Sequence, residues 1–143
     1  MAKTAKNKKR LYIGCALTEA PQDFKNAVEQ LKKGLRAEGY EVFDFVGLIA
    51  GTPVDVFNWD IGHCVKDCEA LIAICDYPSI GLGYELAEAV RLKKPILALA
   101  HRDSRVTRLV LGAAEVLPSF SFQRYDELKG VLPVINMWLT EGS

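Results

Sequence analysis

The chain has 143 residues, half of them hydrophobic, and its 18 basic residues balance 18 acidic ones. This size and composition predict one domain with one substantial core, and no apolar run approaches the roughly 20 residues that a membrane span requires. The N-terminus lacks the apolar region of a signal peptide, and the four cysteines lie in apolar or helical stretches that suit reduced thiols. We therefore expect a cytoplasmic protein without membrane contact.

Five basic residues and no acidic one lie within the first ten positions. A block of like charges is typical of a solvated, disordered tail, and nucleic-acid binding through it alone would be weak and sensitive to salt. We expect a basic tail over residues 1–10, one folded domain over residues 11–143, and no nucleic-acid partner.

Strand and helix patterns alternate from the start of this domain. The apolar run 11–16 predicts a first strand, and residues 41–45 predict a second. Gly39 is placed to end the helix between them. That helix is indicated by apolar residues at spacings of four, three and four, namely Phe24, Val28, Leu31 and Leu35.

The middle of the chain holds a second helix and a buried strand. Thr52 and Pro53 have the order of an N-cap and a first helical residue, and the apolar stripe that follows predicts a helix as far as Cys68. The apolar run 70–74 predicts a third strand, and residues 86–90 read as the helix after it.

The remaining elements complete an α/β pattern. We predict a fourth strand over 95–100, a short helix over 106–114, a fifth strand over 120–122 and a last helix over 125–139. Pro133 should kink or restart that helix. Five strands alternating with helices predict a single three-layer α/β/α domain around a five-stranded parallel sheet.

The loop after the third strand holds the candidate chemistry, because ligands of such sheets bind where the carboxyl ends of the strands lie. Gly81 and Gly83 would let backbone N–H groups approach an anion at a helix start, and Ser79 adds a hydroxyl. Glu85 is expected in the first helical turn, where the dipole favours an ionised carboxylate that could act as a nucleophile. On the glycine pattern alone, simple turn chemistry is the favoured interpretation, since Leu86 stands where a dinucleotide fingerprint has its third glycine.

Tyr12 and Asp60 could share one pocket with Glu85. Strands one and three are commonly neighbours in such sheets, so their carboxyl-end loops would converge. Each residue also has a simpler interpretation: Tyr12 as a core residue, Asp60 as a polar residue on a helix face, and Glu85 as an acid favoured by the helix dipole.

No metal or cofactor is expected. A group of possible ligands does occur on the second helix, but no further Cys/His cluster completes a zinc site. That group is His63, Cys64, Asp67 and Cys68. His101 follows the fourth strand without a clearly exposed cysteine beside it, so no Cys–His catalytic pair is predicted either.

Two segments carry a family resemblance. Pro78-Ser79-Ile80-Gly81-Leu82-Gly83-Tyr84-Glu85-Leu86, followed by Lys94-Pro95-Ile96-Leu97, resembles the nucleoside 2-deoxyribosyltransferase family, and within it the 2′-deoxynucleoside 5′-phosphate N-hydrolases. The likeness extends from Leu11 to about Tyr125 and implies a Rossmann-like or flavodoxin-like sheet. By resemblance, Glu85 matches the nucleophile that attacks the anomeric carbon, Asp60 the acid that assists departure of the base, and Tyr12 a tyrosine that orients the nucleophile.

The resemblance also implies a substrate site and a partner. Ser79, Gly81 and Gly83 match the 5′-phosphate loop of the hydrolases. In the family a neighbouring subunit completes the active site, and Thr107 falls near the position of that partner's hydroxyl donor. A homodimer with shared active sites, or a higher oligomer, is therefore expected.

The chain departs from the family pattern in two places. Ala16 and Thr18 stand where hydrolases that favour monophosphates carry a serine and an arginine, and Glu19 nearby would repel a phosphate. The segment between Asp60 and the third strand is also one residue longer. The expected function is cleavage of the N-glycosidic bond of a nucleoside or (deoxy)nucleoside 5′-monophosphate through a covalent glycosyl-Glu85 intermediate. The alternatives are a deoxyribosyltransferase that exchanges bases, a nucleotide-binding sensor without turnover, and an unrelated flavodoxin-like module.

Overall fold

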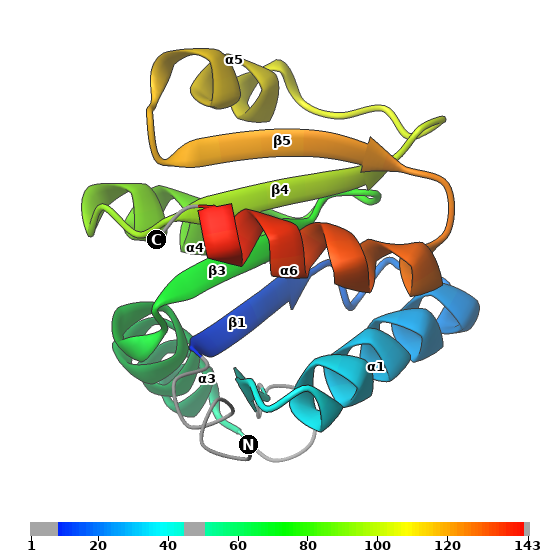
Figure 1. Ribbon diagram of the computed structural model, residues 1–143. Coiled ribbons are helices and arrows are strands. Elements are labelled where there is room, and N and C mark those ends of the chain that lie inside the picture. The colour runs from blue at the N-terminus through cyan, green and yellow to red at the C-terminus, as the bar shows by residue number, and fades with distance from the viewer. Residues whose placement is uncertain (1–8, 45–50, 142–143) are drawn as a thin grey trace.

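The computed structural model describes residues 9–44 and 51–141 (Figure 1). Most of the predicted basic tail, and Phe45 at the end of the second predicted strand, lie outside these ranges. The elements are β1 Arg10–Cys15, α1 Gln22–Ala37, β2 Glu41–Phe43, α3 Pro53–Trp59, the π-helical segment η2 Asp60–Val65, β3 Ala70–Ile74, α4 Ile80–Arg91, β4 Ile96–His101, α5 Arg108–Val116, β5 Phe120–Tyr125, the 3-10 turn η3 Leu128–Gly130 and α6 Val131–Glu141.

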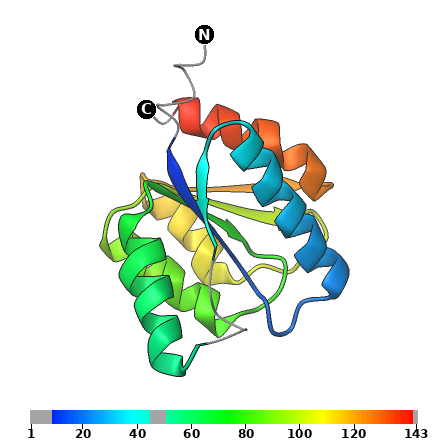
Figure 2. The ribbon, with the colours of Figure 1, turned by 90° about the horizontal axis from the view of Figure 1, so that it is seen from below.

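The five strands form one parallel sheet in the order β2-β1-β3-β4-β5. Figures 1 and 2 show α1 and α6 on one face of this sheet and α3, α4 and α5 on the other. The predicted three-layer α/β/α fold is thereby confirmed. The expected neighbourhood of strands one and three is also confirmed, since Tyr12 of β1 lies opposite Leu71 of β3.

Alternate side chains along the strands point to opposite faces of the sheet and pack in two separate hydrophobic cores. Leu11 and Ile13 of β1 pack with α1 and α6, whereas Tyr12 between them packs with α4. Every residue of β3 is buried, as expected for a central strand covered on both faces. The side chains of β1 that face α4 are therefore placed directly beneath the loop and helix that follow β3.

Several helix ends follow from the sequence. Gly39, just beyond α1, has a φ of 101°, which a residue without Cβ adopts without strain. Thr52 caps α3 with a reciprocal pair of hydrogen bonds to Asp55. Pro133 is the third residue of α6, where its missing N–H has no helical acceptor to lose.

Several boundaries differ from the predictions; β4 and α5, for example, begin one and two residues later than predicted. β1 begins one residue earlier, at Arg10, because this residue pairs with Glu41 at the start of β2. β5 continues to Tyr125, which pairs with His101, so the last helix does not begin there but at Val131 after η3. The helix from Pro53 is not uniformly α-helical either, because its second half is the π-helical segment η2.

None of the helices in the described ranges combines the length and apolar character that a bilayer crossing requires. All four cysteines lie within those ranges and carry free thiols.

Candidate active site

Tyr12 and Glu85 meet on the face of the sheet that α4 covers. The Tyr12 hydroxyl donates a hydrogen bond of 2.7 Å to Oε2 of Glu85. Both side chains are nearly inaccessible, with 2% of Tyr12 and 8% of Glu85 exposed. A strand residue and a helix residue 73 positions apart therefore hold a carboxyl group in a fixed place at the carboxyl edge of the sheet.

Gly14 makes room for this carboxyl group. A Cβ at position 14 would lie 3.1 Å from Oε1 of Glu85 and 2.8 Å from Cδ1 of Leu82. Sequence reasoning missed this residue, although a glycine inside a strand often marks the close approach of another group. Gly14 and Tyr12 point to the same face, so together they shape the space in which Glu85 lies.

Asp60 lies across the same pocket. It is the first residue of η2, and its Oδ1 is buried yet accepts no hydrogen bond from the described part of the chain. A π-helical turn accommodates one residue more than an α-helical turn. Asp60 lies at the start of this wider turn and lines the pocket.

The protonation of the three groups follows from their burial. Burial raises the pKa of Glu85 to about 7, with the Tyr12 hydrogen bond opposing the rise and the charge of Asp60 adding to it. Burial also raises the pKa of Asp60. Burial and the charges of Glu85 and Asp60 raise the pKa of Tyr12 far above its ordinary value, so Tyr12 stays a proton donor. The expectation that a helix dipole keeps Glu85 ionised is therefore wrong.

The reason is the position of the helix start. α4 begins at Ile80, so Glu85 is its sixth residue and lies beyond the first turn. Ser79 is the N-cap, and its Oγ accepts a hydrogen bond of 3.0 Å from the N–H of Leu82. The dipole effect falls off within the first turn, and burial decides the pKa of Glu85 instead.

Tyr12, Asp60 and Glu85 line one pocket of about 250 Å³, together with Ser79 and Gly81. Five of the seven predicted site residues are thereby brought together. The pocket lies above the carboxyl ends of β1 and β3, where ligands of open α/β sheets bind.

Gly83 and Thr107 lie elsewhere. Both line a cavity of about 510 Å³ between α4 and α5, which shares Ser79 and Leu82 with the pocket of Tyr12, Asp60 and Glu85. The N–H of Gly83 donates to the Ser79 carbonyl at 3.1 Å and is thus engaged within the helix. Thr107 caps α5, its Oγ1 accepting from the N–H of Leu109.

An apolar hollow adjoins the two carboxyl groups. It is about 450 Å³ in volume, and Asp60 and Glu85 form its polar side. Phe57 and Tyr84 line it, with their rings 6.1 Å apart in an edge-to-face arrangement. Flat apolar and aromatic surfaces of this kind suit a planar ring system.

The residues considered as metal ligands make other contacts instead. Nδ1 of His63 lies 2.8 Å from Oδ2 of Asp67, while Cys64 and Cys68 are buried in the core. Within residues 9–44 and 51–141, no group of three His, Cys, Asp or Glu side chains is placed to hold a metal ion.

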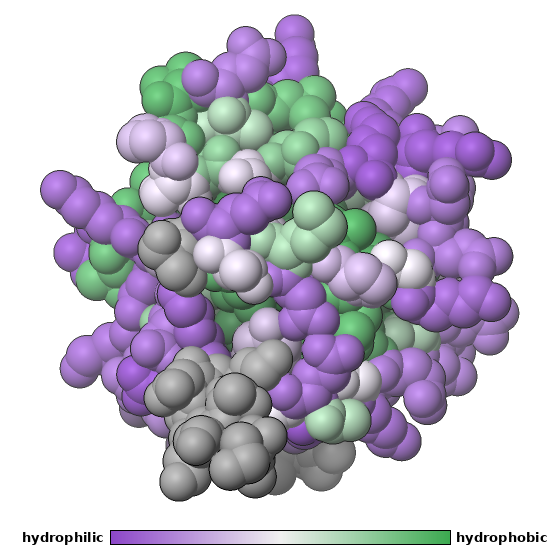
Figure 3. Space-filling view, in the orientation of Figure 1, coloured by the Kyte–Doolittle hydropathy of each residue, from purple (hydrophilic) through white to green (hydrophobic). Residues whose placement is uncertain are grey.

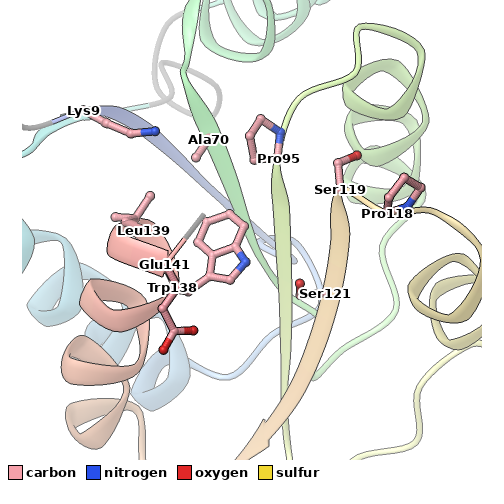
Figure 4. A pocket seen from close by; sticks show the side chains of 9 residues that line it. All are labelled: Lys9, Ala70, Pro95, Pro118, Ser119, Ser121, Trp138, Leu139 and Glu141. Carbon is pink, nitrogen blue, oxygen red and sulfur yellow. The ribbon is translucent and has the colours of Figure 1, made fainter. Parts of the chain in front are cut away.

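A further cavity, of about 480 Å³, lies at the opposite edge of the sheet (Figure 4). Figure 4 shows Pro95 and Ser119, which precede β4 and β5, across from Trp138 of α6. Lys9 and Glu141 are the charged residues of its lining. None of the predicted site residues lies there, so size alone does not indicate where the chemistry is.

Comparison with known proteins supports the resemblance drawn from the sequence. No protein-family model matches the chain. A protein of Syntrophotalea carbinolica named 2′-deoxynucleoside 5′-phosphate N-hydrolase 1 is 37% identical over 81 residues, which make up 55% of this chain and 54% of the relative. The chain thus spans about half the length of the curated relatives it matches.

Two solved structures share the fold. The CMP N-glycosidase of Clostridium botulinum is similar with a TM-score of 0.68 and 22% identity, over 90% of this chain and 99% of the other. The 2-deoxyribosyltransferase of Leishmania mexicana is similar with a TM-score of 0.58 and 21% identity, over 84% of this chain and 81% of the other. At these identities the two structures support the fold alone. They confirm the predicted Rossmann-like fold, and the sequence relatives support the resemblance to the 2′-deoxynucleoside 5′-phosphate N-hydrolases.

Proposed function

We propose that the chain cleaves the N-glycosidic bond of a nucleoside or (deoxy)nucleoside 5′-monophosphate and releases the base. The observation that carries this proposal is the Tyr12–Glu85 hydrogen bond of 2.7 Å inside a pocket that Asp60 also lines. Most enzymes that hydrolyse a glycosidic bond use a pair of carboxyl groups at one site.

Glu85 is the nucleophile in this reaction. Cleavage builds positive charge on the sugar, and an ionised carboxylate close to C1′ stabilises that charge. One Glu85 oxygen forms a bond to C1′ while the bond from C1′ to the base nitrogen breaks. Tyr12 donates to Oε2 and thereby holds the carboxylate in one orientation, which leaves Oε1, beside Gly14, as the attacking oxygen.

Asp60 is the acid. Its raised pKa favours the protonated form that a departing base requires, since the base leaves with the bonding electron pair and takes up a proton. The buried Oδ1, without a hydrogen bond among the described residues, can accept one from a sugar hydroxyl.

Water completes the hydrolysis. It attacks C1′ of the glycosyl-Glu85 intermediate and gives its proton to the Asp60 carboxylate, and Glu85 is released. If a second base attacks instead, the outcome is transfer of the sugar. The apolar hollow beside Phe57 and Tyr84 suits the base in both cases.

A second copy of the chain is expected to complete the site, as the resemblance implies. Large apolar side chains are exposed on α4 and α5, with 94% of Ile80 and 83% of Leu109 accessible. Figure 3 shows hydrophobic surface along the upper edge of the molecule, where Figure 1 places α5. These side chains give a homodimer an apolar surface to bury.

The proposal is tested by incubating the protein with each common nucleoside and nucleoside 5′-monophosphate and measuring the release of free base. Release is expected from at least one substrate and should be lost in Glu85→Ala. An unchanged rate in that variant, or binding of a nucleotide without any release, would reject the mechanism in favour of another nucleophile or a sensor.

Two further measurements separate the remaining alternatives. Adding a foreign base to the reaction should still yield free sugar, and a new nucleoside would indicate a transferase. Mass spectrometry of Asp60→Asn after brief incubation with a substrate whose leaving group needs no proton should show a glycosyl adduct on Glu85, because the first step stays fast while loss of the residue that accepts the proton from water slows the second step.

A further inference from the structure

The turn that carries Asp60 is attached to the end of β2. Trp59 directly precedes Asp60 and is the N-cap of η2. Its Nε1–H donates a hydrogen bond of 2.7 Å to the carbonyl oxygen of Asp44, the residue after β2. Cys64, four residues after Asp60, donates its thiol to the same carbonyl at 3.7 Å. One backbone oxygen thus contacts η2 on both sides of Asp60 in the sequence.

A stack of rings makes a second attachment. The ring of Trp59 lies 4.4 Å from the ring of His63, and the ring of His63 lies 4.8 Å from that of Phe43 in β2, measured between ring centres. Nδ1 of His63 lies 2.8 Å from Oδ2 of Asp67, which orients the imidazole in the middle of the stack. Trp59 is therefore held by its ring as well as by its N–H.

The anchor of this arrangement is itself held by α1. Oδ1 of Asp44 accepts a hydrogen bond of 2.8 Å from Nη2 of Arg36 and lies 3.7 Å from Nζ of Lys32. The same Nη2 of Arg36 donates to the carbonyl of Val42 in β2 at 2.7 Å. Two cations of one helix thus fix the residue whose carbonyl receives the Trp59 N–H.

Asp60 depends on these attachments more than Glu85 does. Tyr12 orients Glu85 directly, through its hydroxyl. Oδ1 of Asp60 is buried and receives no hydrogen bond from residues 9–44 and 51–141. The direction of the Asp60 side chain is therefore set by the backbone of the wide turn, and the contacts of Trp59 fix where that turn begins.

We propose that Trp59 is a positioning residue for the acid: its hydrogen bond to Asp44 and its contact with His63 hold the η2 turn so that the Asp60 carboxyl group faces the bond that breaks. This inference rests on the proposed function for the role of Asp60. Trp59 itself lines neither the pocket of Asp60 nor the apolar hollow beside it, so it is expected to act through Asp60.

The first test compares two substrates in Trp59→Phe, which keeps an aromatic ring beside His63 but removes the N–H. Release of an ordinary base, which takes up a proton from Asp60, should slow by roughly 10-fold or more at an unchanged KM, because a small misplacement of a catalytic group is costly. Cleavage of a substrate whose leaving group needs no proton should keep its rate. Trp138→Phe is the matched control, since Trp138 is the other tryptophan and lines the cavity at the opposite edge of the sheet; both rates should stay unchanged in it.

A double-mutant cycle tests whether Trp59 acts through Asp60. Asp60→Asn cannot donate the proton, so adding Trp59→Phe to it should cost no further rate, as expected for residues that act as one unit. The proposal is overturned if Trp59→Phe slows both substrates equally, or if it slows neither. A full further loss of rate in the double variant would overturn it as well.

Carbon NMR of the carboxyl groups separates this inference from the proposed function. Burial raises the pKa of Asp60, and the signal of this residue is identified by its absence from Asp60→Asn. If the turn loosens, the carboxyl group meets more water, so Trp59→Phe should lower this pKa toward its ordinary value and Trp138→Phe should not. An unmodified protein that releases no base but shows this change in pKa would keep the positioning role and lose the acid catalysis. An unchanged pKa of Asp60 in Trp59→Phe would reject the positioning role whether or not base is released.

Discussion

Replacing Glu85 with glutamine should abolish base release and at the same time stabilise the protein at alkaline pH. Glu85 is 8% exposed, and burial raises its pKa from 4.5 to about 7. The folded state therefore binds a proton more tightly than the unfolded state does. Stability falls as pH rises from about 4.5 through about 7, because in that range the folded protein must give up a proton that the unfolded chain has already lost.

The size of the effect follows from the shift. At about 1.4 kcal/mol per pKa unit, a change from 4.5 to about 7 corresponds to roughly 3 kcal/mol of stability lost between acid and alkaline conditions. A glutamine keeps an oxygen that can accept the Tyr12 hydrogen bond but never ionises. Glu85→Gln should thus match the unmodified protein near pH 4.5 and exceed it by up to roughly 3 kcal/mol at pH 8.

Urea unfolding at pH 4.5, 6 and 8 measures this difference. Glu88→Gln is the control, because Glu88 lies on the same helix but accepts hydrogen bonds from Arg91, which lower its pKa; its replacement should give no gain at high pH. The reasoning is refuted if Glu85→Gln gains nothing between pH 4.5 and pH 8. In that case the carboxyl group is not titrating in a buried site.

Three further substitutions test the arrangement around Glu85. Tyr12→Phe removes a hydrogen bond that lowers the pKa of Glu85, so the acidic inflection in the pH profile of kcat/KM should move above pH 7. If that inflection does not move, a group other than Glu85 determines it. Asp60→Asn should slow release of ordinary bases by roughly 100-fold or more. Cleavage of a substrate whose leaving group needs no proton should slow much less, and an equal loss of rate on both substrates would exclude an acid role. Gly14→Ala should lower kcat and cost about 1–3 kcal/mol in urea unfolding, because its Cβ would lie 3.1 Å from Glu85 Oε1. The matched change Gly112→Ala meets no atom within 4 Å and should leave activity unaltered.

The parts of the site that sequence could predict depend on strand order. β3 was predicted residue by residue, since the apolar run 70–74 is bounded clearly on both sides, and its pairing with β1 follows from the usual order of such sheets. That pairing is what brings Tyr12 toward Glu85. The placement of Glu85 in the first helical turn failed because the Ser79 cap begins α4 earlier than the pattern suggested.

Other parts depend on contacts that no pattern records. Gly14 can be recognised as part of the site only once the approach of Glu85 to β1 is known. The π-helical form of residues 60–65 is not indicated by the apolar stripe, which predicts a helix without distinguishing an α-helical from a π-helical turn. The separation of Gly83 and Thr107 from the pocket of Tyr12, Asp60 and Glu85 depends on which side of α4 Gly83 faces and on where α5, whose N-cap is Thr107, packs beside α4.

The asymmetry between the two carboxyl groups accounts for their separate roles. Carboxyl groups that share a pocket favour a state with only one negative charge between them. Tyr12 donates its hydrogen bond to Glu85, which opposes the rise that burial gives to the pKa of this carboxyl group, whereas Asp60 Oδ1 receives no hydrogen bond from the described residues. The Tyr12 hydroxyl thus favours the ionised form that the proposed nucleophile needs, and Asp60 has no comparable donor. A substrate that reaches the proposed site therefore meets one negative charge there rather than two.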